Sequence, residues 1–233
     1  MIKSNILALD ASTEALSIVL HYQGKTFHHF EECPQQHSQK ILPLIDELLG
    51  KAGCKLKDLD VIGFGQGPGS FTGVRISVAI AQGLAYSTNL PLVGVSTLAV
   101  MAQQALEQFG AKDVYSSIDA RMGEIYFAQY QEKDGLMTLK GEERVFKPEL
   151  LDATLIDINI DAAGVGTGFK SYPDSLTAFN NVTIQSEISL PDAHYMLALV
   201  EAQYLAGKGV QASDAQPKYV RDTVTWKKLP GRE

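Results

Sequence analysis

The sequence predicts an α/β protein made of two lobes, and three observations support that prediction. Three successive strand patterns open the chain, and two helix–strand steps follow them, which together make a mixed five-stranded sheet with a parallel portion. Strand patterns begin again at Val114, after a helix pattern that stops at Gly110. We therefore expect an N-terminal lobe over residues 1–102 and a smaller C-terminal lobe over 103–233, with the segment from Pro217 onward free to pack back on either lobe.

The elements of the first lobe follow from apolar periodicity and from the positions of glycine. Strands are expected where short apolar or alternating runs occur, at residues 6–9, 16–22, 25–31, 61–65 and 92–95. Helices are expected where apolar residues recur every three or four positions, at residues 38–49, 74–87 and 97–109. Gly50, Gly53 and Gly110 supply the helix stops.

The second lobe repeats strand patterns around short turns. Strands are expected at residues 114–119, at 124–130 and shortly before 145. A second glycine-rich stretch covers residues 162–168. Asp192 is the predicted cap of a last helix that ends near Gly207.

The composition indicates a chain with a real core and an excess of acidic residues. Of 233 residues, 45% are hydrophobic, which suits one large or two small domains. The 27 acidic residues exceed the 20 basic ones, and the net charge of −7 argues against tight RNA binding by this chain alone. Neither a signal-peptide pattern nor a membrane-length apolar run occurs, so we expect a soluble, cytoplasmic protein without a membrane partner. Cys33 and Cys54 lack metal-ligand spacing and are expected to be free thiols.

A glycine-rich loop, Gly65–Gly73, joins a predicted strand to a predicted helix. Its bare N–H groups could cradle an anion, helped by the helix dipole. The loop lacks the lysine of a P-loop and the last glycine of a dinucleotide fingerprint, and Ser70 lacks the flanking glycines of a nucleophile elbow. A tight strand–helix turn, in which glycine permits close packing and positive φ, explains the loop equally well.

Two further polar stretches are candidates for the same kind of ligand. Asp10-Ala-Ser-Thr13 follows the first strand, and Asp119-Ala-Arg121 opens a turn in the second lobe. The residues that would contact an anion or a nucleotide such as ADP or ATP are Asp10, Ser12, Gly69, Ser70 and Asp119. The simpler interpretations are a Ser/Thr-rich hairpin turn and a surface turn with a local Asp–Arg pair.

Six stretches, taken together in their order, resemble one protein family through almost the whole chain. They are Asp10-Ala-Ser-Thr13, His37-Ser-Gln39, Gly67-Pro-Gly-Ser-Phe-Thr-Gly-Val-Arg-Ile76, Gly94-Val-Ser-Thr-Leu98, Asp119-Ala-Arg-Met-Gly-Glu-Ile-Tyr126 and Pro217-Lys-Tyr-Val-Arg221. In these motifs the chain is similar to the TsaB family, also called YeaZ. The resemblance implies the two-lobed actin-like and sugar-kinase-like (ASKHA) fold with a shortened second lobe. It also implies a role in putting threonylcarbamoyl on N6 of the adenosine next to the anticodon in tRNA.

The resemblance further implies that the chain has no catalytic site of its own. The catalyst of the pathway is a larger paralogue, TsaD, in which the strand matching residues 92–95 is followed by a His-x-x-x-His metal motif. The matching stretch here, Ser96–Val100, contains no histidine, whereas a metal held on one helix face needs imidazoles at i and i+4. The other histidines offer no substitute metal site. His28 and His29 are neighbours in a predicted strand, so their side chains point to opposite faces and cannot share an ion. His21, His37 and His194 each stand alone in the sequence. We expect no catalytic residue, no metal site and no required cofactor.

The expected role is that of an activating partner for a TsaD-type paralogue. Such a partner would meet a TsaE-type ATPase through the complex, would touch tRNA only indirectly, and would form a homodimer when alone. The alternative is an actin-like ATPase or kinase acting by itself, with Asp10 and Asp119 holding magnesium and Gly69–Gly73 holding phosphates. The short second lobe and the lack of an acid committed to an acceptor count against this alternative. A protease finds no support, because neither a zinc motif nor an activated serine occurs.

Two helices carry more apolar surface than one sheet requires. The apolar arc of the helix at 38–49 is wider than a single sheet contact needs, and the helix at 74–87 is apolar nearly all round. In one interpretation the layers of the lobe itself cover these faces. In the second interpretation, which the resemblance supports, the additional apolar surface of the two helices faces a TsaD-type partner or a second copy of the chain. The residues expected in a patch at that interface are Ile41, Leu44, Ile45, Leu48, Val74, Val78, Ala81, Gln82 and Ala85.

Overall fold

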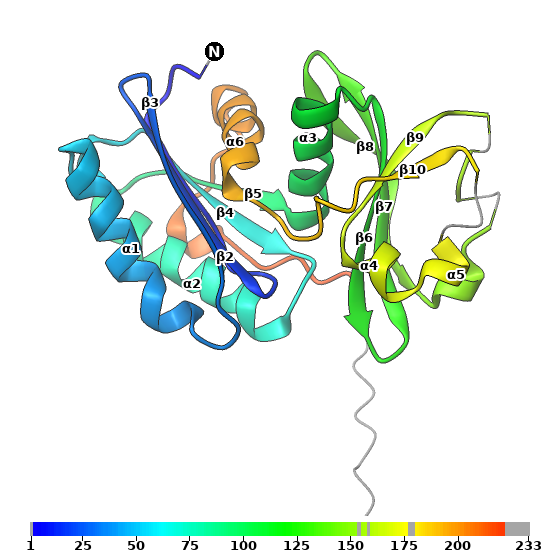
Figure 1. Ribbon diagram of the computed structural model, residues 1–233. Helices are drawn as coiled ribbons and strands as arrows, with labels where there is room; N and C mark the ends of the chain where they lie inside the picture. The colour runs from blue at the N-terminus through cyan, green and yellow to red at the C-terminus, as the bar shows by residue number, and fades with distance from the viewer. Residues whose placement is uncertain (1, 153–154, 158, 177–179, 222–233) are drawn as a thin grey trace, which may run out of the picture.

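The computed structural model describes residues 2–152, 155–157, 159–176 and 180–221. Two five-stranded sheets, each mixed in strand direction, form the centres of two lobes (Figure 1). The predicted α/β class is therefore confirmed. Helices lie on the faces of the sheets, and one of them stands between the lobes.

The first sheet holds the predicted meander and two parallel strands. Its strands are β1 (Ile6–Asp10), β2 (Ala15–Tyr22), β3 (Lys25–Glu32), β4 (Val61–Gly67) and β5 (Leu92–Ser96). Their order across the sheet is β3-β2-β1-β4-β5. β1 pairs antiparallel with β2 and parallel with β4, and β4 pairs parallel with β5. The parallel pairs require crossover connections, which the helices supply.

Helices cover both faces of the first sheet. α1 (His37–Ala52) and α2 (Phe71–Thr88) lie on one face, and α6 (Met196–Leu205) lies on the other (Figure 1). Alternate residues of β1 show the two layers, because Leu7 packs with side chains of α1 and α2 while Ala8 packs with those of α6. The continuous apolar run of β1 is thus buried on both sides, as its pattern predicts.

The second sheet is an antiparallel meander extended by two short parallel strands. Its strands are β6 (Asp113–Arg121), β7 (Glu124–Lys133), β8 (Leu136–Phe146), β9 (Ala162–Val165) and β10 (Val182–Ile184). Their order is β10-β9-β6-β7-β8, with β9 parallel to both β6 and β10. Two short helices, α4 (Thr167–Ser171) and α5 (Pro173–Leu176), follow β9.

The remaining helix, α3 (Thr97–Phe109), stands between the two sheets (Figure 1). Leu98 and Met101 belong to a core cluster with side chains of β6 and β7, whereas Val100 belongs to the cluster beneath α6. Both sheets therefore bury the same helix. The predicted division between residues 102 and 103 falls inside α3. Helix α6 comes late in the chain but covers the first sheet.

Two helices have limits different from those that their patterns indicate. α2 begins at Phe71 rather than at Val74, because the Ser70 hydroxyl accepts a hydrogen bond from the N–H of Gly73 at 3.4 Å and caps the first turn. α1 continues through Gly50 and ends at Gly53, whose φ is 67°. No helix in the described part of the chain is long and apolar enough to cross a membrane.

Candidate functional site

The two loops predicted to hold an anion lie directly against each other. The loop between β1 and β2 contains Ser12, and its carbonyl oxygen accepts a hydrogen bond from the N–H of Ser70 at 2.7 Å. A Cβ atom placed on Gly69 would overlap that same carbonyl oxygen, and one placed on Gly73 would overlap the carbonyl oxygen of Ala11. The glycines therefore permit backbone-to-backbone contact, and the backbone of the first loop fills the space above the second.

Asp10 is sealed beneath this contact. Its side chain is fully buried, and Oδ1 accepts hydrogen bonds from the Ser12 N–H at 2.7 Å and the Ser12 hydroxyl at 2.5 Å. Oδ2 has no partner among the described residues and faces Gly65, where a Cβ atom would overlap it. Burial raises the pKa of Asp10 to about 6, against the lowering effect of the hydrogen bonds from Ser12. The carboxyl group thus has neither solvent nor a cation beside it in the described part of the chain.

Asp119, the fifth predicted contact, makes its bonds within the second lobe. Its carboxylate accepts hydrogen bonds from the Arg121 N–H at 2.9 Å and the Tyr172 hydroxyl at 3.3 Å. The Arg121 side chain lies 3.9 Å from the Asp119 carboxylate and 2.6 Å from that of Glu14. Arg121 is thus the partner in the predicted local Asp–Arg pair and also joins the second lobe to the loop after β1. The structure brings four of the five predicted contacts together and leaves Asp119 in the other lobe.

Most of the residues predicted at a partner interface point into the core instead. Seven of them are at most 5% exposed and pack against the first sheet: Ile41, Ile45, Leu48, Val74, Val78, Ala81 and Ala85. This corrects the expectation that they form an exposed patch. The physical reason is that α1 and α2 lie next to each other on a broad sheet, so the sheet takes up the apolar arcs of both helices. Leu44 is half-buried, and Gln82 donates a hydrogen bond to the Ala215 carbonyl at 3.0 Å.

α1 and α2 nevertheless expose a different set of apolar side chains. Tyr86 of α2 is 83% exposed and Leu42 of α1 is 48% exposed. Ala79 and Gly83 are exposed on the face of α2 that carries Tyr86. Half-buried apolar side chains flank this stripe on the two helices: Leu44, Ile76, Ile80 and Leu84. The periodicity of the sequence could not identify this face, because a helix that is apolar nearly all round does not show which side meets the sheet.

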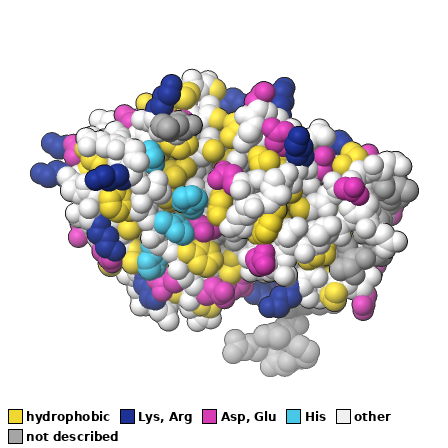
Figure 2. All heavy atoms as spheres, turned by 45° about the horizontal axis from the view of Figure 1, so that its top comes forward, with side chains coloured by type: hydrophobic (Ala, Val, Ile, Leu, Met, Phe, Trp, Pro, Cys, Tyr) yellow, Lys and Arg dark blue, Asp and Glu magenta, His cyan; other side chains and the backbone are white. Residues whose placement is uncertain are grey.

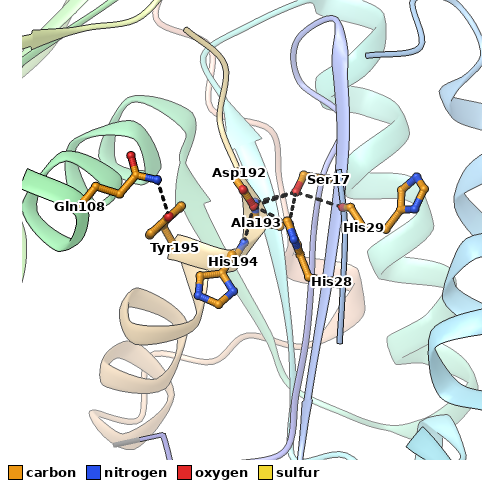
Figure 3. A network of polar contacts seen from close by, with 8 residues as sticks. All are labelled: Ser17, His28, His29, Gln108, Asp192, Ala193, His194 and Tyr195. Atoms are coloured by element: carbon orange, nitrogen blue, oxygen red, sulfur yellow. Dashed lines mark hydrogen bonds and ion pairs between the residues drawn. The ribbon is translucent and has the colours of Figure 1, made fainter. Parts of the chain in front are cut away.

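A second cluster, at the start of α6, combines a serine, a histidine and an aspartate (Figure 3). His28 Nε2 lies 2.7 Å from Asp192 Oδ1, and the Ser17 hydroxyl lies 3.2 Å from the same oxygen and 3.4 Å from the same ring nitrogen. In a catalytic triad the carboxylate and the serine contact opposite nitrogens of the ring, so this arrangement is not a triad. Asp192 also accepts a hydrogen bond from the His194 N–H at 2.8 Å and so caps the short 3₁₀ helix Ala193–Tyr195, which leads into α6, whereas the N-cap of α6 itself is Tyr195. The cluster fastens the start of α6 to β2 and β3.

The electrostatics of this cluster follow from its contacts. Burial acts to raise the pKa of Asp192, but the hydrogen bonds from His28 and from the His194 N–H outweigh it and hold the pKa below its usual value. His29, next to His28 in β3, points to the other face and lies 3.2 Å from Glu31, as strand alternation predicts. Figure 2 shows histidine side chains gathered on one face of the first lobe. Within the described residues, no three His, Cys, Asp or Glu side chains lie close enough together to hold a metal ion.

Comparisons with known proteins connect this architecture to one family. A family model described as TsaD, tRNA N6-adenosine threonylcarbamoyltransferase, matches residues 29–226. The tRNA threonylcarbamoyladenosine biosynthesis protein TsaB of Escherichia coli is 44% identical over 229 residues, covering 98% of this chain and 99% of that protein. TsaB of Haemophilus influenzae is 44% identical over 237 residues and covers 98% of both chains. The structure of YeaZ from Pseudomonas aeruginosa is 40% identical, covers 93% of this chain and all of its own, and superposes with a TM-score of 0.86.

The comparisons confirm the family resemblance that the motifs indicate, and the chain shares the two-lobed fold of YeaZ. The matches cover nearly the whole chain, so the assignment includes both sheets and α3 between them. The chain belongs to the TsaB, or YeaZ, family of tRNA threonylcarbamoyladenosine biosynthesis proteins.

Proposed function

We propose that the chain is a partner subunit, without turnover of its own, of a TsaD-type enzyme that transfers threonylcarbamoyl to N6 of the adenosine next to the anticodon in tRNA. The observation that carries the proposal is the contact between the two loops at the end of β1 and the start of α2. A phosphate site at a helix N-terminus needs free N–H groups and room for an anion. Here the N–H of Ser70 already donates to the Ser12 carbonyl, and that carbonyl oxygen, which would repel an anion, lies directly against Gly69.

The state of Asp10 supports the same proposal. An acid that holds magnesium in a phosphoryl-transfer site must reach the ion or its waters. Asp10 is fully buried, and its free oxygen faces the backbone of Gly65. We therefore propose that the chain requires neither a bound nucleotide nor a metal ion for its role.

For the partner contact we propose the outer face of α1 and α2, because most of the residues that the sequence predicted at the interface are buried against the first sheet. We call it the outer face, and it consists of Leu42, Leu44, Ile76, Ala79, Ile80, Gly83, Leu84 and Tyr86. The small residues of the stripe let a partner helix approach closely, while Tyr86 offers a large, rigid contact at low entropic cost. The proposed partner on this face is a TsaD-type paralogue, and a second copy of the chain takes its place when the paralogue is missing. A stable contact of this kind would bury about 1,600 Å² of surface in total. The TsaE-type ATPase and tRNA then join through the complex.

The experiment that tests this function is co-purification of the chain with its TsaD-type paralogue, followed by the mass of the complex in solution. Tyr86→Arg, on the outer face, should leave the fold intact and abolish the complex. Leu205→Arg is the matched control, because Leu205 is also an exposed apolar residue (68%) at the end of a helix but lies on the opposite side of the sheet. A Tyr86→Arg chain that still pairs as tightly as the control would exclude this face as the interface.

The same preparation tests the catalytic part of the proposal. The purified chain should neither hydrolyse ATP nor modify tRNA, and a calorimetric titration with ADP or ATP should give no stoichiometric binding. Steady turnover of ATP by the chain alone would instead favour the actin-like ATPase or kinase. A variant such as Asp10→Asn would then have to lose that turnover, because Asp10 would be its magnesium ligand.

A further inference from the structure

The last described segment of the chain, residues 215–221, runs across the boundary between the lobes, and we call it the clasp. In the first lobe it is bonded through its backbone. The Lys218 N–H donates to the carbonyl oxygen of Gln66 at 2.8 Å, and the Ala215 carbonyl accepts from the Gln82 side chain at 3.0 Å. The clasp is therefore fixed both to the end of β4 and to the side of α2.

An aromatic and cationic stack strengthens this attachment to α2. The Arg75 guanidinium lies 3.6 Å from the centre of the Phe71 ring, and its Nε donates to the Tyr219 hydroxyl at 2.8 Å. The Phe71 and Tyr219 rings are 5.8 Å apart. Because a stacked guanidinium gains from both the ring and the hydroxyl, the first turn of α2 holds the clasp by its side chains as well as by its backbone.

In the second lobe the clasp is held by charge. Lys218 Nζ lies 3.0 Å from Glu143 Oε2. The Arg221 guanidinium contacts the Glu124 carboxylate and donates to the Ala120 carbonyl at 3.2 Å. Both cations of the clasp are therefore engaged by carboxylates of the second sheet, on β7 and β8.

Glu143 is the point at which the lobes and the clasp meet. Its side chain is only 2% exposed, and its Oε1 accepts hydrogen bonds from the Tyr130 hydroxyl at 2.8 Å and from the Ser96 hydroxyl. Ser96 ends β5 in the first sheet, whereas Tyr130 lies on β7 in the second. Burial, and after it the charge of Glu143, raises the pKa of Tyr130 well above 10, so its hydroxyl remains a donor. One buried carboxylate thus accepts hydrogen bonds from both sheets and forms an ion pair with Lys218.

We propose that the clasp, acting through Glu143, locks the angle between the two lobes, so that the chain presents one fixed arrangement instead of opening and closing. A further charged link between the lobes, Arg121 to Glu14, is exposed at both ends, at 72% and 44%, and such pairs contribute little to stability. In the clasp, Lys218 is 45% exposed but Glu143 is only 2% exposed, so removal of Lys218 leaves the carboxylate of Glu143 away from water without its counter-ion. This inference stands whether or not the proposed function is correct.

The test is a distance measurement between the lobes in the full-length chain. Spin labels on Lys57→Cys and Lys140→Cys, both exposed and in different lobes, report the separation by pulsed electron resonance once Cys33 and Cys54 are replaced by alanine. With the clasp intact we expect one narrow distance distribution. Lys218→Met combined with Arg221→Met removes both cations and keeps their apolar stems, and we expect the distribution to broaden and to shift to longer distances.

Two further variants make the result decisive. Arg144→Met is the matched control, because Arg144 is a neighbouring cation on β8 whose partner, Glu142, is exposed on the surface. Its distribution should remain narrow. Glu143→Gln should reproduce the broadening, but if it fails to fold, the double variant of the clasp still carries the test. A folded double variant with the narrow distribution of the control would overturn the proposal, since α3 and its core contacts would then hold the lobes alone.

Discussion

At the scale of single residues, Asp10 connects burial with a dependence of stability on pH. Its pKa is about 6 in the folded chain and 3.8 for an ordinary aspartate, so the folded state holds a proton that the unfolded state releases between these values. The free energy of unfolding therefore falls as the pH rises through this window. The contribution of the group is most favourable below the lower value and is lost above the higher one.

The first prediction follows from this fall in the free energy of unfolding with rising pH. Asp10→Asn removes the charge that burial disfavours, so we expect the free energy of unfolding at about pH 7 to rise by up to about 3 kcal/mol, at about 1.4 kcal/mol for each unit of pKa. The gain is smaller if the new amide N–H finds no acceptor, and it should vanish near about pH 4, where Asp10 is protonated as well. Urea unfolding at both pH values measures it, with exposed Asp46→Asn as the control. Equal destabilisation at both pH values would contradict the assignment of a disfavoured charge.

The second prediction concerns the contact between the loops. Gly69→Ala places a Cβ atom on the Ser12 carbonyl, and the loops must separate to admit it, at a cost of about 1–3 kcal/mol. Gly50→Ala is the matched control, because nothing lies within 4 Å of its added Cβ and alanine is favoured over glycine in a helix by about 1 kcal/mol. Thermal unfolding of both variants checks the contrast. If Gly69→Ala were as stable as the parent, the two backbones would not be in contact.

Part of the candidate site could be predicted from the sequence at this scale. The motifs suggest five contacts, and the structure brings Asp10, Ser12, Gly69 and Ser70 together but leaves Asp119 in the second lobe. The sequence could not show that the Ser12 carbonyl fills the site. That direction depends on the backbone path between β1 and β2, which polar and glycine residues leave open.

At the scale of the elements, the two helices on the first sheet show what periodicity can and cannot predict. Their positions and apolar arcs follow from the spacing of apolar residues. Which arc faces the sheet depends on how α1 and α2 lie beside each other, and that is a property of the assembled layer. The residues expected to meet a partner, such as Val78, therefore lie in the core, whereas Tyr86 of the same helix is exposed.

The third prediction tests the orientation of α2 directly. Val78 is 5% exposed against the sheet, so Val78→Arg buries a charge without a partner and should cost several kcal/mol, on the order of 3–5. Circular dichroism should show a largely unfolded chain. Ala79→Arg, at the next position on the exposed side of the helix, should fold normally. The opposite pattern would mean that α2 is turned the other way about its axis.

At the scale of the whole molecule, the architecture is predictable only where contacts are local. The meander, the crossovers and the three antiparallel strands of the second sheet follow from patterns within short stretches, and the six motifs add the family fold. The patterns do not indicate β9, which lies in the glycine-rich stretch, or β10. The packing of α6 on the first sheet, and of the clasp across the two lobes, depends on contacts between residues that are far apart in sequence. His28 meets Asp192 across 164 positions, and Arg221 meets Glu124 across 97. Neither pair has a local signature.

The fourth prediction concerns RNA. The net charge is −7, and two cations of the basic C-terminal stretch, Lys218 and Arg221, are engaged by carboxylates. The others lie outside the described residues: Lys227, Lys228 and Arg232. We expect the chain alone to bind tRNA no more tightly than about 1 µM at physiological salt, the range of non-specific contacts. Fluorescence anisotropy across a salt series measures this affinity, and Lys218→Met should leave it unchanged. Nanomolar binding with a steep salt dependence would refute the prediction.

The position of α6 has a consequence for the synthesis of the protein. A chain emerges from the ribosome starting at its N-terminus, and the strands of the first sheet are complete once Ser96 has appeared. The helix that covers one of their faces, Met196–Leu205, is made much later. Until then Ile6, Ala8 and Val61, all buried beneath α6 in the folded protein, lack that cover. Exposed apolar strands of this kind are prone to aggregation, so the first sheet is most vulnerable between the synthesis of Ser96 and that of α6.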